Sequence, residues 1–222
     1  MKKQMERYRS VMLLGLMLMP GLIAAGNPKK DDLQDQVDQL DQRVIALETV
    51  EVCPPGAPTR FVDNGDGTIC DHQAGLMWEM KDAGNGFPDF SNPHSVDNWY
   101  TWTNENVDPV GATPDGTAFI DFLAQLNGEA TNDADMAGVG FAGYTDWRLA
   151  NLAELRTILD CSFGPPCIDP IFGQTLASRY WSSTSFALAL DNAWTVNFDD
   201  GSLSSNIGKN NLLFVRAVRG GR

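Results

Sequence analysis

The sequence predicts an α+β domain with antiparallel strands, two main helices and long loops, preceded by a short trimeric coiled coil. Three observations carry this prediction. Short apolar runs separated by Asn-Gly and Asp-Gly turns are typical of antiparallel strands. Two later stretches repeat apolar residues at helical spacing. A heptad pattern of Leu and Val precedes both and indicates a coiled coil.

Residues 1–25 are expected to form a secretory signal peptide. A basic start at 2–9 is followed by an apolar run at 11–19, which Pro20-Gly21 interrupts. That run is shorter than the roughly 20 apolar residues that span a membrane. Small residues at Ala24 and Ala25 favour cleavage before Gly26, which leaves no transmembrane anchor. An uncleaved N-terminal anchor is the alternative.

Residues 26–52 are expected to form a coiled-coil stalk. Apolar side chains recur at spacings of four and three, at Leu33, Val37, Leu40, Val44 and Leu47. The run from Arg43 to Glu48 resembles the pattern that specifies trimers, in which the Arg pairs with a Glu of a neighbouring helix. We therefore expect a parallel homotrimer. The alternative is a monomeric amphipathic helix that packs on its own domain.

The Pro-rich run 53–58 ends this helix, because proline cannot continue it, and forms a stiff linker. A globular domain is then expected over 59–222, long enough for one sizeable core.

Charge limits the choice of partners. The chain has 16 Lys and Arg against 29 Asp and Glu, a net charge of −13. Removing residues 1–25 changes this to −16, and residues 53–222 alone carry nine basic and 21 acidic side chains. Nucleic-acid binding is therefore not expected, since phosphate contacts need clustered Lys and Arg.

The four cysteines, Cys53, Cys70, Cys161 and Cys167, predict two disulfides formed outside the cytoplasm. Three pairings are open. The short Cys161–Cys167 stretch looks like a self-closed loop, which leaves Cys53 for Cys70. No Cys-x-x-Cys zinc spacing occurs, and a reactive catalytic Cys is the alternative. We expect a secreted, periplasmic or cell-surface location.

The elements of the globular domain follow in order. A three-stranded meander is expected over 60–63, 68–71 and 76–78, with turns at 64–67 and 72–75. A long irregular segment covers 82–114. Helices are expected over 116–127 and 151–159, the second with Asn151 as N-cap and Glu154 completing a capping box. Further strands are expected over 180–184, 193–198 and 212–219, the last closing the sheet.

Several separated motifs resemble one bacterial family, that of the C-terminal domain of the Legionella collagen-like adhesin (Lcl). They are Phe61–Thr68, Gly75–Trp78, Gly143–Leu149, Glu154-Leu155, Tyr180–Thr184, Ala193–Val196 and Val215–Arg219, so the resemblance covers about residues 60–220. One departure is Ala150, where the family usually has Pro after Trp-Arg-Leu.

The resemblance implies a C-type-lectin-like fold, secretion, and, in the adhesin, trimers that bind sulfated glycosaminoglycans. It carries over no catalytic residues, and we do not expect an enzyme. Sulfate recognition needs a basic surface, so this acidic domain is expected to disfavour such ligands. No collagen-like repeat is present; the coiled coil takes its place.

Two groups of residues are candidates for a site. Trp99, Tyr100 and Trp102 lie in the irregular segment and could stack on sugars, or could anchor that loop to the core. Asp63, Asp66 and Asp71 are weak calcium candidates, for which the alternative is a structural hairpin turn. No other cofactor or metal is expected.

Other polar and aromatic residues are given structural roles. These are core packing for Trp78, Trp147, Trp181 and Trp194, an ion-pair network for Asp146, Arg148, Arg216 and Arg219, and loop positions for His72 and His94.

The favoured function is a secreted or surface-exposed homotrimeric binding or adhesion protein whose ligand is a glycan or a surface protein. The alternative is a structural or assembly component of the cell envelope or extracellular matrix. An enzyme on a formylglycine-generating type of scaffold is the least favoured, because that chemistry needs reactive cysteines.

Overall fold

The computed structural model describes residues 36, 39, 52–104, 113–129 and 137–221. The chain divides into two compact units, 1–50 and 51–222. In the first unit Gln36 and Gln39 are helical and exposed. The predicted signal peptide and the heptad residues of the predicted trimer lie outside the described residues and stay predictions. Within the described part of the chain, no helix combines the length and apolarity needed to cross a membrane.

A meander opens the second unit, as predicted. It consists of β1 (Phe61–Asp63), β2 (Thr68–Asp71) and β3 (Leu76–Glu79), joined antiparallel. Gly65 and Gly67 adopt positive φ in the first turn, a conformation that glycine reaches without strain. Both β2 and β3 are buried on both faces, which explains why their sequences do not alternate.

The end of the chain completes this sheet. The strand β8 (Ala217–Gly220) pairs antiparallel with β3 and with the two-residue β4 (Arg148–Leu149), which gives the order β1-β2-β3-β8-β4. The predicted single strand 212–219 is therefore wrong in extent. Its first half instead pairs with other segments, Leu213 with Tyr100 and Phe214 with Tyr180.

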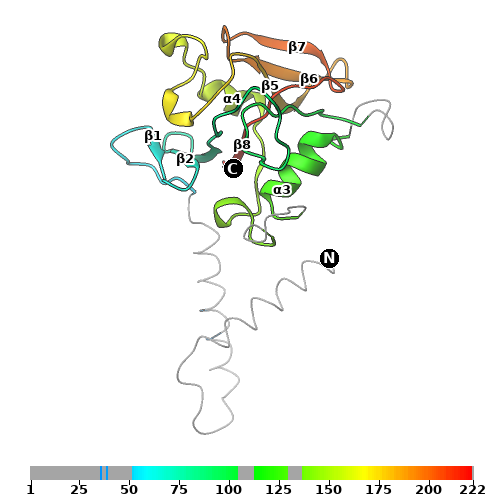
Figure 1. The fold of residues 1–222 in the computed structure, drawn as a ribbon. Coiled ribbons are helices and arrows are strands. Elements are labelled where there is room, and N and C mark those ends of the chain that lie inside the picture. Colours follow the sequence, from blue (N-terminus) through cyan, green and yellow to red (C-terminus); the bar gives the residue numbers. More distant parts are fainter. Residues whose placement is uncertain (1–35, 37–38, 40–51, 105–112, 130–136, 222) are drawn as a thin grey trace, which may run out of the picture. The chain divides into compact units, whose positions relative to one another are not determined.

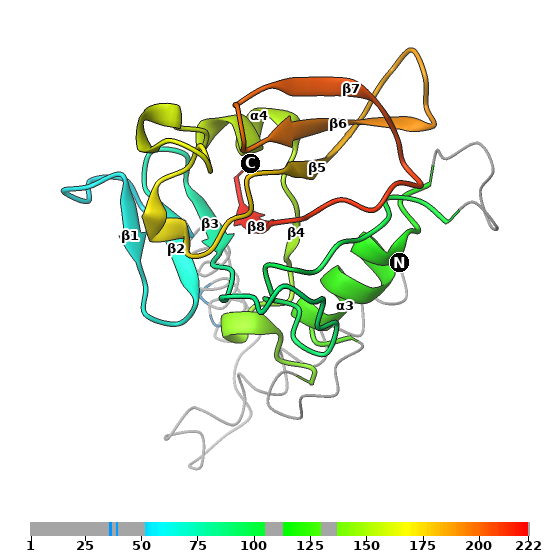
Figure 2. The same cartoon turned by 45° about the horizontal axis from the view of Figure 1, so that its top comes forward.

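A separate antiparallel sheet contains β5 (Arg179–Ser185), β6 (Asn192–Asn197) and β7 (Leu203–Gly208). From the sequence we predicted one sheet and no strand at β7, and both predictions are wrong. The strand β7 is mostly polar, lies at the edge of its sheet and is little buried. It therefore lacks the alternation of apolar and polar residues that is typical of a half-buried strand. Figures 1 and 2 show this sheet in orange, with α4 beside it.

Two helical regions occupy the predicted positions. The first is a π-helical turn, η1 (Ala118–Leu123), followed by the short α3 (Ala124–Leu126). The second, α4 (Leu152–Thr157), has the predicted capping box: Glu154 N donates to Asn151 Oδ1 at 2.9 Å, and Asn151 N donates to Glu154 Oε2 at 2.8 Å. Single 3-10 turns are η2 (Phe141–Gly143), η3 (Cys161–Phe163) and η4 (Pro170–Phe172).

Both favoured disulfides are present, Cys53–Cys70 and Cys161–Cys167. The first ties the start of the domain to β2, and the second closes the loop that contains η3. Cys53 is fully buried, so the Pro-rich run begins inside the packed domain.

Two clusters of buried side chains form the core, and antiparallel strands with a few helices make the domain α+β. Trp147 and Trp181 belong to one cluster, and Trp78 to the other. These three are buried as predicted. Trp194 is only half-buried and packs edge-on against Phe186, 5.8 Å between ring centroids.

Candidate functional site

The segment 99–104 carries the three aromatic candidates, and its side chains alternate between accessible and buried from Trp99 to Trp102. Tyr100 is 1% and Trp102 is 3% exposed, whereas Trp99 is 36% exposed. Burial raises the pKa of Tyr100 well above its ordinary range, so its hydroxyl stays neutral. This burial removes Tyr100 and Trp102 from the sugar-stacking candidates and corrects the prediction for both. Stacking stays a prediction for Trp99.

Tyr100 and Trp102 are inside because hydrogen bonds tie this segment to β5 and to the C-terminal part of the chain. Trp102 Nε1 donates to the carbonyl oxygen of Ser182 at 3.1 Å, and Trp181 Nε1 donates to that of Tyr100 at 2.9 Å. The amides of Tyr100 and Leu213 bond each other's carbonyl oxygens. These two rings therefore anchor the loop.

Trp99 keeps an accessible aromatic neighbour. The ring of Phe90 packs edge-on against Trp99, 6.4 Å between centroids, and Phe90 is itself exposed. An accessible indole braced by a second ring is a surface on which the apolar face of a sugar can stack.

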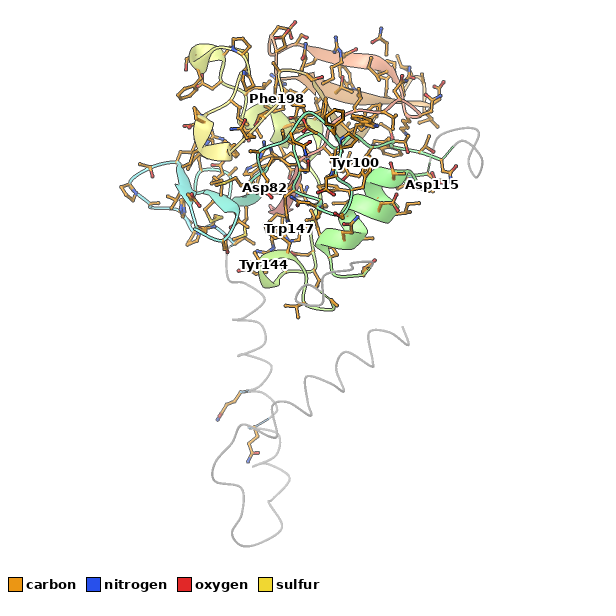
Figure 3. The ribbon with its side chains drawn as sticks, in the orientation of Figure 1. Asp82, Tyr100, Asp115, Tyr144, Trp147 and Phe198 are labelled. Carbon is orange, nitrogen blue, oxygen red and sulfur yellow. A yellow bond between two sulfur atoms is a disulfide. The ribbon has the colours of Figure 1, made fainter. Side chains whose placement is uncertain are left out.

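A pocket of about 280 Å³ opens beside the same segment. Its polar wall consists of hydroxyl, amide and carboxylate side chains: Thr101, Thr103, Asn104, Asp115, Thr117 and Asn210. Ile120, which is 53% exposed, supplies an apolar side. We call this the Asp115 pocket. Figure 3 labels Asp115 near the start of the helical region that η1 and α3 form.

The two segments that build the pocket approach closely because residue 116 is glycine. A Cβ at Gly116 would lie 2.5 Å from backbone atoms of residues 101–103. In its absence, Gly116 N donates to Trp102 O at 3.1 Å and Ala118 N donates to Thr101 O at 3.0 Å. The walls of the pocket are therefore held by backbone hydrogen bonds.

The Asp115 carboxylate is only half satisfied. Its Oδ1 accepts from Thr103 Oγ1 at 3.0 Å and from the Asn104 amide at 2.8 Å. Its Oδ2 is buried and has no hydrogen-bond donor. Among the described residues, the other buried side-chain atoms that lack a hydrogen-bond partner are all N–H donors. Asp115 Oδ2 is therefore the one unpaired buried acceptor in that part of the chain. Buried polar groups are normally paired, and an exception calls for an explanation.

The calcium candidates do not converge. Asp63 Oδ1 accepts from Gly65 N, and Asp66 Oδ1 accepts from Thr68 N and Oγ1. Asp71 is fully buried and forms an ion pair with Arg60 at 2.7 Å. Within the described ranges, no group of three or more His, Cys, Asp or Glu side chains is arranged to hold a metal. The hairpin-turn alternative accounts for the bonds of Asp63 and Asp66.

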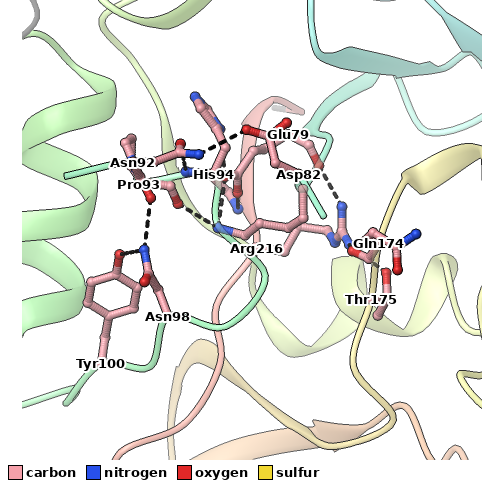
Figure 4. A network of polar contacts seen from close by, with 12 residues as sticks. Glu79, Asp82, Asn92, Pro93, His94, Asn98, Tyr100, Gln174, Thr175 and Arg216 are labelled. Carbon is pink, nitrogen blue, oxygen red and sulfur yellow. Dashed lines mark hydrogen bonds and ion pairs between the residues drawn. The ribbon is translucent and has the colours of Figure 1, made fainter. Parts of the chain in front are cut away.

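A cluster of buried charged side chains joins β3 to the end of the chain (Figure 4). Glu79 Oε1 accepts from Lys81 Nζ at 2.8 Å and from His94 Nδ1 at 2.9 Å, and its Oε2 accepts from the Ala217 amide at 3.0 Å. Arg216 donates to the carbonyl oxygen of Glu79 at 2.7 Å. Glu79, Lys81 and Arg216 are buried. We call Glu79, Lys81, His94 and Arg216 the Glu79 cluster.

These partners shift the ionisation of Glu79. Burial by itself raises the pKa of the Glu79 carboxyl, but Lys81, His94 and the Ala217 amide outweigh it and lower the pKa to about 2. Burial lowers the pKa of Lys81, and the Glu79 carboxylate opposes that shift. Glu79, Lys81 and Arg216 are buried and bond one another or neighbouring backbone, so we interpret the cluster as structural.

The four residues of the predicted ion-pair network have different partners in the structure. Asp146 pairs with Arg219 at 2.7 Å and Arg148 pairs with Glu154 at 2.7 Å, while Arg216 belongs to the Glu79 cluster. His72 is a loop residue whose Nδ1 contacts Pro54 O at 2.5 Å. These contacts are structural ion pairs and loop bonds, as expected. The contact of His94 with Glu79 was not predicted from the sequence.

Burial removes slightly more cations than anions from the surface, since Asp71 and Glu79 are the buried anions among the described residues. Lys81, Lys209 and Arg216 are buried, although they are three of the nine basic residues in 53–222. Three further arginines form ion pairs with carboxylates: Arg60, Arg148 and Arg219. The domain therefore offers few accessible cations to an anionic ligand.

A model of one protein family, the Lcl C-terminal domain, matches residues 67–219. The chain belongs to this family. The match begins at Gly67 in the first turn and ends at Arg219 in β8, so it includes the Glu79 cluster and the Asp115 pocket. No curated protein matches the chain.

Sequence reasoning missed the pocket of this Lcl C-terminal domain. It selected the aromatic residues of the segment and passed over the threonines between and after them. The alternation of aromatic and hydroxyl side chains from Tyr100 to Thr103 was the available signal, since alternation in an extended segment separates a buried from an accessible face. The contribution of Asp115 comes from a different segment, so no local pattern reveals it.

Proposed function

We propose that this protein is an extracytoplasmic homotrimeric binding protein of the adhesin type, whose Lcl C-terminal domain binds a glycan or a surface protein. Membership of the family is the observation that carries the proposal. The two disulfides support a location outside the cytoplasm, because disulfides persist in oxidising compartments.

The heptad pattern at 33–47 supports the trimer. Three domains on one stalk multiply weak contacts, because each further binding event becomes intramolecular. The acidic surface argues for ligands other than the sulfated glycosaminoglycans of the adhesin, since an anionic polymer would be repelled at long range.

A role without catalysis is part of the proposal. All four cysteines are joined in disulfides, so thiol chemistry on this scaffold would have no thiolate to use.

The trimer is tested by mass in solution. Sedimentation equilibrium of the full chain should give three times the chain mass. Leu40→Asp places a charge in the apolar seam and should give a monomer. Gln39→Asp adds the same charge at an exposed neighbouring position and should leave the trimer intact. A full chain that is monomeric at micromolar concentration would reject the trimer.

Binding is tested with the same three proteins on arrays of glycans and of bacterial and host surface proteins. The trimeric forms should bind a defined set of spots, and Leu40→Asp should bind them at least about tenfold more weakly because avidity is lost. Wild-type protein that binds no spot, yet is isolated within a large envelope or matrix complex, would favour the structural alternative.

A further inference from the structure

We infer that the Asp115 pocket binds a saccharide unit that carries a protonated amino group. This inference rests on the proposed binding function and names the class of ligand. It follows from the unpaired oxygen of Asp115, from the charge of the domain, and from the lining and size of the pocket.

The first step concerns Asp115 Oδ2. A carboxylate only accepts hydrogen bonds, and this oxygen is buried without a donor. The other oxygen is held by Thr103 Oγ1 and the Asn104 amide, so the side chain is already oriented. A fitting ligand must therefore bring an N–H or O–H donor, and it gains more from one that carries charge.

The second step concerns charge. Residues 53–222 have a net charge of −12, and three of their basic side chains are buried away from the surface. The field of such a domain raises the local concentration of cations and lowers that of anions. An ammonium group has three donors and no acceptor, which complements a carboxylate oxygen that has only lone pairs to offer.

The third step separates a sugar from a lysine side chain. Hydroxyl groups of Thr101, Thr103 and Thr117 line the pocket, and a hydroxyl can both donate and accept. Ile120 adds an apolar surface. A ring with hydroxyls at its edge and C–H groups on its faces matches this mixture better than an alkyl chain.

Size agrees with one saccharide unit. The volume of about 280 Å³ is close to the lower end of the roughly 300–1,000 Å³ common for small-molecule sites. Trp99 precedes Thr101 by two residues and shares the accessible side of the segment. An adjoining unit of an oligosaccharide would find that indole within reach.

The test is calorimetric titration of the full chain with a glucosamine tetrasaccharide and with its fully N-acetylated counterpart, below the ordinary pKa of an amino group. The wild-type protein should bind the free-amine form about 10- to 100-fold more tightly, the range of a hydrogen bond to a charged group. Added salt should reduce this preference.

Asp115→Asn is the decisive variant. The amide oxygen can keep the two bonds of Oδ1, while an NH₂ group replaces Oδ2 and faces the ammonium. The preference should vanish. Asp121→Asn is the matched control, because Asp121 is an exposed residue of η1 outside the pocket and the charge change is the same. That variant should keep the preference.

Each other outcome has a definite meaning. Equal binding of the two tetrasaccharides, or a preference that survives Asp115→Asn, would overturn the inference. A tetralysine peptide that binds as tightly, with the same dependence on Asp115, would overturn its saccharide part. If the protein binds other array spots but neither tetrasaccharide, the inference fails and the proposed function stands; if it binds nothing, the proposed function fails as well.

Discussion

The Glu79 cluster and the Asp115 pocket each contain a carboxylate with little access to water, and the two are satisfied to different degrees. Every oxygen of Glu79 has a partner: a lysine, a histidine and a backbone amide. Asp115 has partners for one oxygen only. Glu79 sits among buried cations, whereas Asp115 sits beside an opening that neutral polar groups line.

The number of unpaired acceptors distinguishes a structural carboxylate from one that can bind a ligand. A buried charge whose hydrogen bonds are all made within the protein has no free acceptor for a ligand. Removing it leaves its charged partners buried without a counter-charge. A charge with an unmet acceptor reduces stability, and a ligand can relieve that deficit. The Glu79 cluster should therefore be sensitive in stability and the Asp115 pocket in binding.

The largest expected effect comes from Glu79→Gln. The substitution keeps the shape of the side chain but removes the buried anion beside the ammonium of Lys81 and the guanidinium of Arg216. We expect the free energy of unfolding to fall by about 3–5 kcal/mol. Urea unfolding followed by tryptophan fluorescence measures it.

The matched control is Glu154→Gln at a partly exposed ion pair. The side chain of Arg148 is 38% exposed, and Gln can also complete the capping box. The expected loss is below about 1 kcal/mol, as for most surface ion pairs. Equal losses in the two variants would contradict the structural role of the cluster.

Acid should reveal the same cluster in the wild-type protein. The pKa of Glu79 is about 2 in the folded domain, lowered from the ordinary value of 4.5. Because the folded-state value is depressed, the stabilising contribution is complete above about pH 4.5 and is lost as pH falls toward 2. It amounts to about 3 kcal/mol.

Urea unfolding at several pH values across this window measures the slope. In Glu79→Gln the slope should be smaller, since that group no longer titrates. An unchanged slope would assign the acid sensitivity to other carboxyls.

Local patterns were sufficient to predict the elements that local chemistry determines. The turn at 64–67, the capping box of Asn151 and Glu154, and the two disulfides were predicted because each depends on residues close in sequence or on a small number of pairings. The strand β7 escaped because an edge strand needs little burial. The division of residues 212–219 between two segments depends on tertiary pairing, which no periodicity encodes.

The site was predicted less well, and for the same physical reason. Trp99, Tyr100 and Trp102 were selected because they are aromatic, but a ring must be exposed to stack on a sugar. Tyr100 and Trp102 are buried, and tertiary hydrogen bonds hold their segment against β5. Asp115 and Thr103 are 12 residues apart, and their contact forms only when Gly116 lets the two backbones meet.

Gly116→Ala tests how the pocket is built. A methyl group would collide with backbone atoms at 2.5 Å, and backbone cannot move aside as a side chain can. Overpacking of this kind costs about 1–3 kcal/mol. Amide hydrogen exchange should localise the damage to Gly116 and Ala118, whose bonds join the two walls. Loss of protection in β6 as well would indicate global unfolding instead.

The smallest expected effect is the most informative, because Asp115→Asn makes the same carboxyl-to-amide change as Glu79→Gln. The amide oxygen keeps the bonds to Thr103 and Asn104, and a neutral NH₂ group replaces a buried, ionised oxygen that has no donor. An unpaired neutral group costs less to bury than an unpaired charge. We expect the free energy of unfolding to stay the same or to rise by up to about 1 kcal/mol. Thermal and urea unfolding beside the wild type measure the difference. A loss of several kcal/mol would show that Asp115 stabilises the fold as Glu79 does, and the contrast between the two carboxylates would disappear.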